Sequence, residues 1–190
     1  MRIFPYSISL LLGALALTGC AGVSYVSPTD GPVSKVRFVN KSHFPGRVGV
    51  YQFDDESCSI FKYTNMFLLL TGPSDFYTSP RRNLDMPLNT YNDYQAKEVF
   101  IPTNKPFLGG FTGEDGASPF PCSSHIYYPF KEGHEYEIAF ERSMTRSCKT
   151  VLSEIVSDSK APRLVQLKTY PGFIFSGNTD QEGCEGQAPK

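Results

Sequence analysis

The sequence has no tryptophan, only three histidines and almost no net charge. Its 190 residues include 18 basic and 19 acidic side chains, so the formal net charge is −1. A chain without excess positive charge lacks the electrostatic field that non-specific binding to nucleic acid requires, and we expect no nucleic-acid partner. Tryptophan is the preferred side chain of sugar-stacking platforms, so its absence disfavours a site of that kind.

Long hydrophobic runs are also missing, apart from one near the start. Residues 8–17 are almost all apolar and are followed by Thr18, Gly19 and Cys20. About ten apolar residues are too few to cross a bilayer, which takes about 20. A short apolar run before a small-residue processing site is typical of a signal peptide. We predict that residues 1–19 are removed, which leaves 171 residues; because Arg2 is lost, 17 basic then stand against 19 acidic side chains and the net charge is −2.

The tetrapeptide Leu17, Thr18, Gly19 and Cys20 resembles the bacterial lipobox. The resemblance implies that the Cys20 thiol is acylated, for example with palmitate, and two or three acyl chains hold a protein stably on a membrane. Ala21 stands where an aspartate would imply inner-membrane retention, so the expected location is the outer membrane, facing the periplasm. Display at the cell surface is the alternative location, and a secretory leader with a coincidental cysteine is the alternative interpretation of the motif.

An anchor at Cys20 leaves four cysteines for the folded domain. An even number in an oxidising compartment predicts two disulfides, and four cysteines allow three pairings among which the sequence does not choose. None lies in a CxxC motif or a Cys/His cluster, so we expect neither a zinc site nor a redox site, and no metal or cofactor. The disulfide candidates are Cys58, Cys122, Cys148 and Cys184.

No apolar helical stripe continues for twelve residues, whereas short aromatic and β-branched segments alternate with Pro, Gly, Asn and Asp. This pattern predicts a mainly β domain. Nine segments fit a disulfide-stapled, antiparallel two-sheet β-sandwich of immunoglobulin or transthyretin type. They are residues 35–40, 46–53, 61–70, 97–102, 106–111, 123–130, 135–141, 147–156 and 163–169.

We expect the sandwich to comprise residues 35–175. The segments before and after it are polar. Residues 20–34 are rich in Ser, Pro and Gly, and we expect a flexible tether from the lipidated Cys20 that reaches about 45–50 Å. Residues 176–190 form a polar tail. Within the domain, Tyr136, Ile138 and Phe140 should face the core and the residues between them the solvent. Residues 131–134 should form a four-residue hairpin loop.

Residues 71–96 form the longest stretch without a clear strand, and loops of this length are often functional. A crossover packed by its own aromatic side chains, with room for one short helix, is the structural alternative. The candidate binding residues in this segment are Phe76, Tyr77, Arg81, Arg82, Tyr91 and Tyr94.

No catalytic motif surrounds the three histidines, His43, His125 and His134, and we expect structural roles for them. The acidic groups at 54–56 and 114–115 lack the spacing of a calcium loop and are expected to be solvated turns. Tyr127 and Tyr128 are adjacent on one strand, so they should point to opposite faces of the sheet.

Residues 98–102, 105–107 and 130–136, with Cys122 and Cys148, resemble a pattern in uncharacterised small lipoproteins of Gram-negative bacteria. The resemblance implies a compact β-sandwich and no established activity. Our leading hypothesis is a membrane-anchored, non-enzymatic lipoprotein that binds or scaffolds another cell-envelope protein, for example in a secretion or envelope assembly. One alternative is a module that binds glycan, peptidoglycan or a small ligand through residues 71–96, and another is a hydrolase with an unrecognised site. The sequence does not identify the partner or the oligomeric state.

Overall fold

The structure is a computed structural model of the chain that describes residues 25–28, 30–43, 46–53, 63–70, 84–88, 90–114, 122–142, 148–158 and 161–167. These residues form nine strands and, within the described ranges, no helix. All nine predicted strands are confirmed, with ends shifted by a few residues. They are β1 (Val33–Asn40), β2 (Arg47–Phe53), β3 (Tyr63–Leu70), β4 (Ala96–Pro102), β5 (Phe107–Glu114), β6 (Cys122–Tyr128), β7 (Glu135–Arg142), β8 (Cys148–Ser157) and β9 (Pro162–Gln166).

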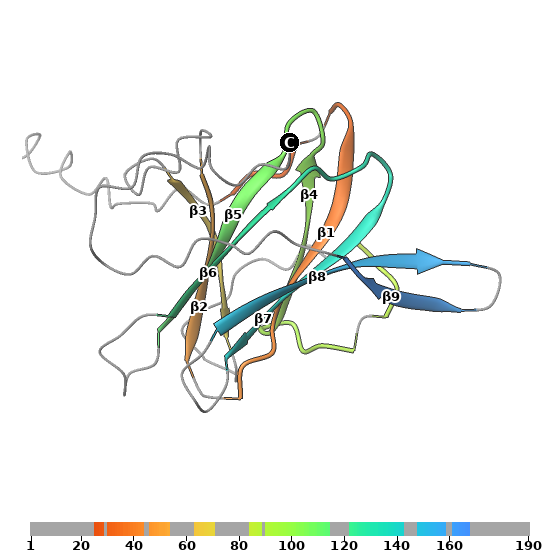
Figure 1. Cartoon of the computed structure of the whole chain (residues 1–190). Helices are drawn as coiled ribbons and strands as arrows, with labels where there is room; N and C mark the ends of the chain where they lie inside the picture. Colours follow the sequence, from red (N-terminus) through yellow and green to blue (C-terminus); the bar gives the residue numbers. More distant parts are fainter. Residues whose placement is uncertain are drawn as a thin grey trace, which may run out of the picture.

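The strands form two sheets that face each other (Figure 1). The five-stranded sheet has the order β4-β1-β7-β8-β9 and the four-stranded sheet the order β3-β2-β5-β6. The predicted two-sheet β-sandwich is therefore confirmed. Every pairing is antiparallel except one, because β1 and β7 run parallel with Lys35 opposite Glu135.

The segment between β6 and β7 is not the hairpin that we predicted. β6 pairs with β5 in the four-stranded sheet, whereas β7 lies between β1 and β8 in the other sheet. The turn at Gly133, whose φ is +74°, carries the chain across the sandwich and is attached to the start of β1. The Gly133 amide donates to the Val33 carbonyl at 2.9 Å, and the Lys35 amide donates to the His134 carbonyl at 3.1 Å. Alternation of side chains along a strand identifies its faces but not its neighbour.

Aromatic side chains from both sheets fill the core. The Phe38 ring lies 5.4 Å from that of Phe67, and 5.9 Å from those of both Phe107 and Phe111. Each such side chain contributes about 1.5–3 kcal/mol by leaving water. The predicted inward face of β7 is confirmed, since its three residues are fully buried: Tyr136, Ile138 and Phe140.

The outer face of β7 differs from the expectation that solvent covers it. Glu137 and Ala139 are each only 2% exposed. A buried carboxylate needs a charged or hydrogen-bonding partner. Part of that environment comes from the described residues between β3 and β4, because the Tyr91 hydroxyl donates to Glu137 at 3.0 Å.

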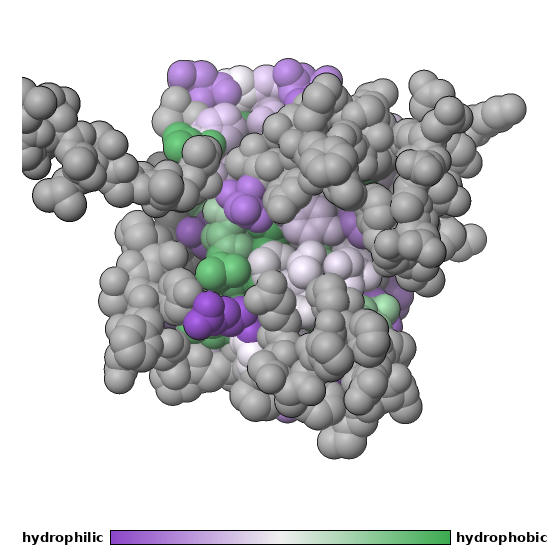
Figure 2. Space-filling view, turned by 90° about the vertical axis from the view of Figure 1, so that its left-hand side faces the viewer, coloured by the Kyte–Doolittle hydropathy of each residue, from purple (hydrophilic) through white to green (hydrophobic). Residues whose placement is uncertain are grey.

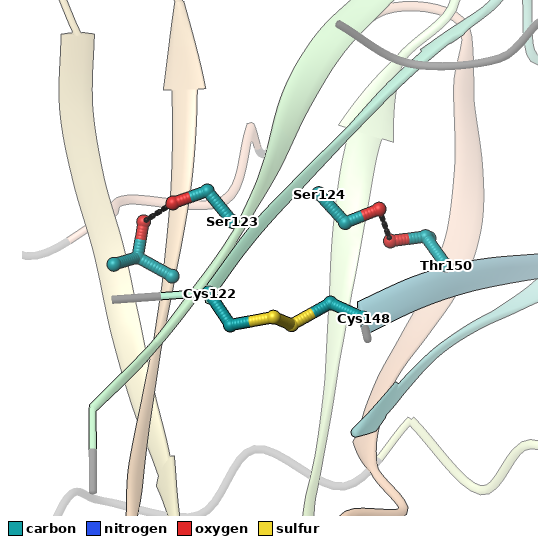
Figure 3. The surroundings of a disulfide bond; sticks show 6 residues. Cys122, Ser123, Ser124, Cys148 and Thr150 are labelled. Atoms are coloured by element: carbon teal, nitrogen blue, oxygen red, sulfur yellow. Dashed lines mark hydrogen bonds between the residues drawn. A yellow bond between two sulfur atoms is a disulfide. The ribbon is translucent and has the colours of Figure 1, made fainter. Parts of the chain in front are cut away.

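Two connections close the open sides of the sandwich. On one side, a disulfide joins Cys122 of β6 to Cys148 of β8, with 6.0 Å between the Cα atoms (Figure 3). The Thr150 hydroxyl donates to the Ser124 hydroxyl beside it at 2.7 Å. The two sheets are thus linked at the β6 edge.

On the opposite side, Tyr25 bridges the edge strands β3 and β4. Its amide donates to the Met66 carbonyl at 3.2 Å, and its hydroxyl donates to the Phe100 carbonyl at 2.7 Å. Ser27 and Ser34 are buried, and β1 begins at Val33. Residues 25–28 and 30–34, which we had assigned to the flexible tether, therefore belong to the domain. The Ser, Pro and Gly composition did not reveal this, because the attachment depends on one tyrosine and on distant strand edges.

The buried hydroxyl of Tyr25 predicts a loss of stability in alkali. Burial raises the pKa of Tyr25 to about 12 from 10.0. The raised pKa means that the buried hydroxyl stabilises the folded state fully below pH 10. This stabilisation is lost as the pH rises to about 12, because in that range only the unfolded chain releases the proton. We expect Tyr25→Phe to make the decline of unfolding free energy over this pH range shallower in denaturant titrations. Losing the hydrogen bond costs about 1 kcal/mol at neutral pH.

Tyr136, whose pKa burial also raises to about 12, is unchanged in this variant and accounts for part of the decline that remains. An identical pH dependence for the wild type and Tyr25→Phe would contradict the prediction.

Candidate functional site

A row of alternating charges crosses three strands on the outer face of the five-stranded sheet. Arg37 on β1 lies opposite Glu98 on β4 and opposite Glu137 on β7. Its Nη2 is 2.9 Å from Glu98 Oε1, and its Nη1 is 3.4 Å from Glu137 Oε2. The Arg37 side chain is 0% exposed, so these ion pairs are buried. Direct cross-strand neighbours of opposite charge stabilise a sheet pairing, and here they specify the register.

The chain between β3 and β4 is attached to this row through its backbone. Arg37 Nη2 donates to the carbonyls of Met86 and Pro87, both at 2.8 Å. Glu98 Oε2 accepts the amide of Leu84 at 2.7 Å. Asp85 and Leu88 have φ of 54° and 60°, a conformation that side chains other than glycine rarely adopt. The contacts with Arg37 and Glu98 stabilise a locally unfavourable backbone.

Lys41 and Tyr91 extend the row beyond Glu137. Glu137 Oε1 accepts from Lys41 Nζ at 2.9 Å and from the Tyr91 hydroxyl at 3.0 Å. Burial alone would lower the pKa of Lys41, but hydrogen bonds with Tyr91 and Glu137 outweigh burial and raise it. Burial is also the main cause of the raised pKa of Tyr91. With Arg37 and Glu98, the cluster has two positive and two negative groups, which neutralise one another.

This cluster holds the described part of the chain between β3 and β4 against the sheet. Each charged group is bonded to another member of the cluster or to the backbone. We name these residues the clamp: Arg37, Lys41, Tyr91, Glu98 and Glu137. The sequence alone did not predict that these five residues form one cluster. Two of its members carry a signal in the sequence: Arg37 stands between Val36 and Phe38, and Glu137 stands between Tyr136 and Ile138. Glu98 has no such signal, because it follows the charged Lys97.

The structure describes two of the six candidate binding residues in the 71–96 segment. Tyr91 belongs to the clamp, and the Tyr94 carbonyl accepts from the Leu70 amide on β3 at 2.7 Å. In residues 84–88 and 90–96 the chain is an irregular crossover without a helix. The other four, Phe76, Tyr77, Arg81 and Arg82, lie outside the described residues, as do Cys20, Cys58 and Cys184.

A second cluster lies on the outer face of the four-stranded sheet, where the Tyr51 hydroxyl and His125 Nε2 are 2.5 Å apart. The ring of Phe53 lies 5.5 Å from that of Tyr51 and 5.8 Å from that of His125. Leu108 packs with this group. From this side, Figure 2 shows a small hydrophobic area bordered by hydrophilic residues.

Gly110 gives Tyr51 the space to lie over β5. A Cβ atom at Gly110 would come within 2.3 Å of the Ser124 carbonyl and 3.1 Å of the Tyr51 hydroxyl. Tyr127 packs with the Tyr51 cluster, whereas Tyr128 packs with the core, so the prediction that they point to opposite faces is confirmed.

The remaining histidines also have structural surroundings. His134 Nδ1 lies 2.5 Å from Glu154 Oε1 on the neighbouring β8 strand. His43 is exposed. Across the ranges that the structure describes, no group of three or more His, Cys, Asp or Glu side chains is placed to hold a metal ion.

The four sheet edges differ in how far the chain itself covers them. β3 and β4 carry the hydrogen bonds of Tyr25, and β6 is linked to β8 by the disulfide. Within the described residues, no strand pairs with the outer edge of β9. β8 and β9 extend to one side of the sandwich (Figure 1), and Arg163, Leu164 and Gln166 on β9 are exposed.

Comparison with family models, with curated proteins and with solved structures finds no match for this chain. Of the residues described, none form a helix long and apolar enough to span a membrane.

Proposed function

We propose that the protein is a lipid-anchored, non-enzymatic module of the bacterial outer membrane, facing the periplasm, that binds another envelope protein through the exposed edge of β9. The observation that carries this proposal is the contrast among the four edges. Among the described residues, the chain's own groups engage three of them, whereas no strand pairs with the outer edge of β9 and the side chains of Leu164 and Gln166 are exposed. An extended segment of a partner can add to such an edge through main-chain hydrogen bonds.

The composition of β9 is consistent with selective pairing. Pro162 has no amide hydrogen, and Arg163 places a charge on the edge, where it lies 3.4 Å from Asp158. Proline and charge at an edge discourage pairing between copies of the same sheet. Leu164, at 41% exposed, offers an apolar contact beside them. A partner strand with an apolar side chain at the matching position fits this edge.

The use of the titratable groups supports a non-enzymatic role. His125 is bonded to Tyr51, His134 to Glu154, and the buried charges of the clamp to one another. A catalytic acid, base or nucleophile must instead be directed at a site that a substrate can occupy. The lipid anchor rests on the resemblance of residues 17–20 to the lipobox.

Site-specific photocrosslinking in intact cells tests the proposal. A photoreactive residue at Leu164 should give a protein adduct of one defined mass. The same residue at Lys149, which is 67% exposed on β8, should not give this adduct. In a second experiment the photoreactive residue is placed at Gln166, and Leu164→Lys in the same chain should abolish the adduct. Because Leu164 is exposed, this substitution should change the free energy of unfolding by less than about 0.5 kcal/mol.

A second control addresses the anchor. Cys20→Ser should release the protein from the membrane fraction and weaken the Leu164 adduct. Equal protein adducts at Leu164 and Lys149, or none at either site, would overturn β9 as the binding edge. Adducts that contain glycan or peptidoglycan instead of protein would favour the ligand-binding alternative.

A further inference from the structure

The attachment of Tyr25 places the folded domain close to the proposed lipid anchor. The Tyr25 side chain packs against the core, and its two hydrogen bonds join it to Met66 on β3 and Phe100 on β4. The chain remains attached further on, because Ser27 is buried and the Pro32 carbonyl accepts from the Thr103 amide at 3.0 Å. We name this side of the sandwich, formed by residues 25–28, β3 and β4, the seam.

Covalent geometry limits the distance from the seam to the lipid. Only residues 21–24 separate Cys20 from Tyr25. Five residues of fully extended chain reach at most about 17–18 Å. A compact domain of about 140 residues, which matches the span from Tyr25 to Leu167, has a radius of gyration of about 14 Å and hence a diameter of about 37 Å. The link is therefore less than half the width of the domain, and the domain cannot turn its far side to the bilayer while Tyr25 stays in place.

We infer that the seam faces the lipid surface at close range and that the β9 edge points away from it. This inference rests on the proposed anchor at Cys20. In the five-stranded sheet β4 and β9 are the two outermost strands, four strand spacings or roughly 19 Å apart. The same chain thus presents one edge to the membrane and the opposite edge to the periplasm. The anchor orients the binding edge as well as retaining the protein.

The side chains of the seam suit a lipid surface. Val26 is 82% exposed, the largest exposure among the large hydrophobic residues described, and Leu68 on β3 is exposed as well. Lys97 on β4 lies over the Phe67 ring of β3, with Nζ 4.9 Å from the ring centroid. An apolar side chain next to the anchor can enter the headgroup region, and an amphipathic lysine is favoured at such an interface.

The absence of tryptophan makes this orientation directly measurable. Val26→Trp and, as the matched control, Leu164→Trp each introduce a single indole at an exposed position. The acylated full-length mature proteins are reconstituted in vesicles of phosphatidylethanolamine and phosphatidylglycerol in which some lipids carry a nitroxide on the headgroup. We expect the Val26→Trp protein to lose most of its indole emission to quenching and the Leu164→Trp protein to retain most of it.

A longer linker supplies a variant that leaves the domain intact. Inserting about ten Gly and Ser residues between Gly22 and Val23 extends the maximum reach by about 33–36 Å. In the Val26→Trp background this insertion should abolish most of the quenching while the protein remains on the vesicles. Equal quenching with and without the insertion would contradict the role of the short link.

The outcomes separate the orientation from the anchor. If both tryptophan variants remain on the vesicles and are quenched equally, the inferred orientation is wrong while the anchor stands. If the proteins prepared from cells carry no acyl chain and do not float with vesicles, the proposed anchor itself fails, and the orientation fails with it.

Discussion

Replacing Arg37 with methionine is expected to lower the free energy of unfolding by about 3–5 kcal/mol. The guanidinium is fully buried and donates to Glu98, to Glu137 and to the carbonyls of Met86 and Pro87. Methionine fills much of the same volume but leaves two buried carboxylates without this partner. The free-energy cost of a buried charge without a partner is much larger than the net stabilisation that the intact ion pair provided. Denaturant titration measures the difference.

An exposed ion pair in the same sheet provides the control. Lys149 and Glu141 are 2.8 Å apart, with side chains 67% and 34% exposed. Lys149→Met should cost at most about 1 kcal/mol, because solvent screens the pair. Should Arg37→Met prove too unstable to purify, Arg37→Lys retains the charge but cannot supply the planar set of donors, and it should also cost more than Lys149→Met. Equal costs for the Arg37 and Lys149 variants would show that the clamp does not stabilise the fold.

The second large effect is expected from the Cys122–Cys148 disulfide. The double variant Cys122→Ser/Cys148→Ser should lose about 3 kcal/mol of unfolding free energy, because the bond closes a loop with a sequence separation of 26 and restricts the unfolded chain. The bond also joins the β6 edge to β8, so its removal takes away a covalent link between the two sheets. Denaturant titration of the oxidised wild type and the double variant checks the value.

Two measurements make this prediction specific. Thr150→Val, which removes only the neighbouring hydrogen bond to Ser124, should cost about 1 kcal/mol. Peptide mapping without reduction should recover Cys122 and Cys148 in one linked fragment. The bond selects one of the three pairings that four cysteines allow, and Cys58 and Cys184 lie outside the described residues. A fragment joining Cys122 to any other cysteine would contradict the structure.

The positions of the strands follow from local sequence. β7 shows the reason: Tyr136, Ile138 and Phe140 alternate with other residues, and a period of two places them on one face whatever lies beside the strand. The same rule separates Tyr127 from Tyr128. Proline and glycine between the segments end the strands because of their own backbone chemistry. Each of these signals acts within a few residues, so a single sequence contains it.

The roles of Glu137, Arg37 and Tyr91 were not predictable in the same way. Glu137 was expected in solvent because glutamate is rarely buried without a partner. Its partners come from β1 and from the crossover between β3 and β4, and the parallel β1–β7 register brings them together. Tyr91 was a candidate for ligand binding because tyrosine serves both roles. Its hydrogen bond to Glu137 depends on contacts that no local pattern encodes.

The tether shows the same division. Composition alone predicted a flexible segment to Ser34, but Tyr25 meets the carbonyls of Met66 and Phe100 only after β3 and β4 have been placed at adjacent edges. The sequence by itself determined the mainly β class, the nine strands and the inward face of β7, because period-two patterning and turn chemistry are local. The tertiary structure alone decided the sheet order, the clamp, the Cys122–Cys148 pairing and the seam, because each joins residues distant in sequence, and their proximity depends on how the whole chain packs.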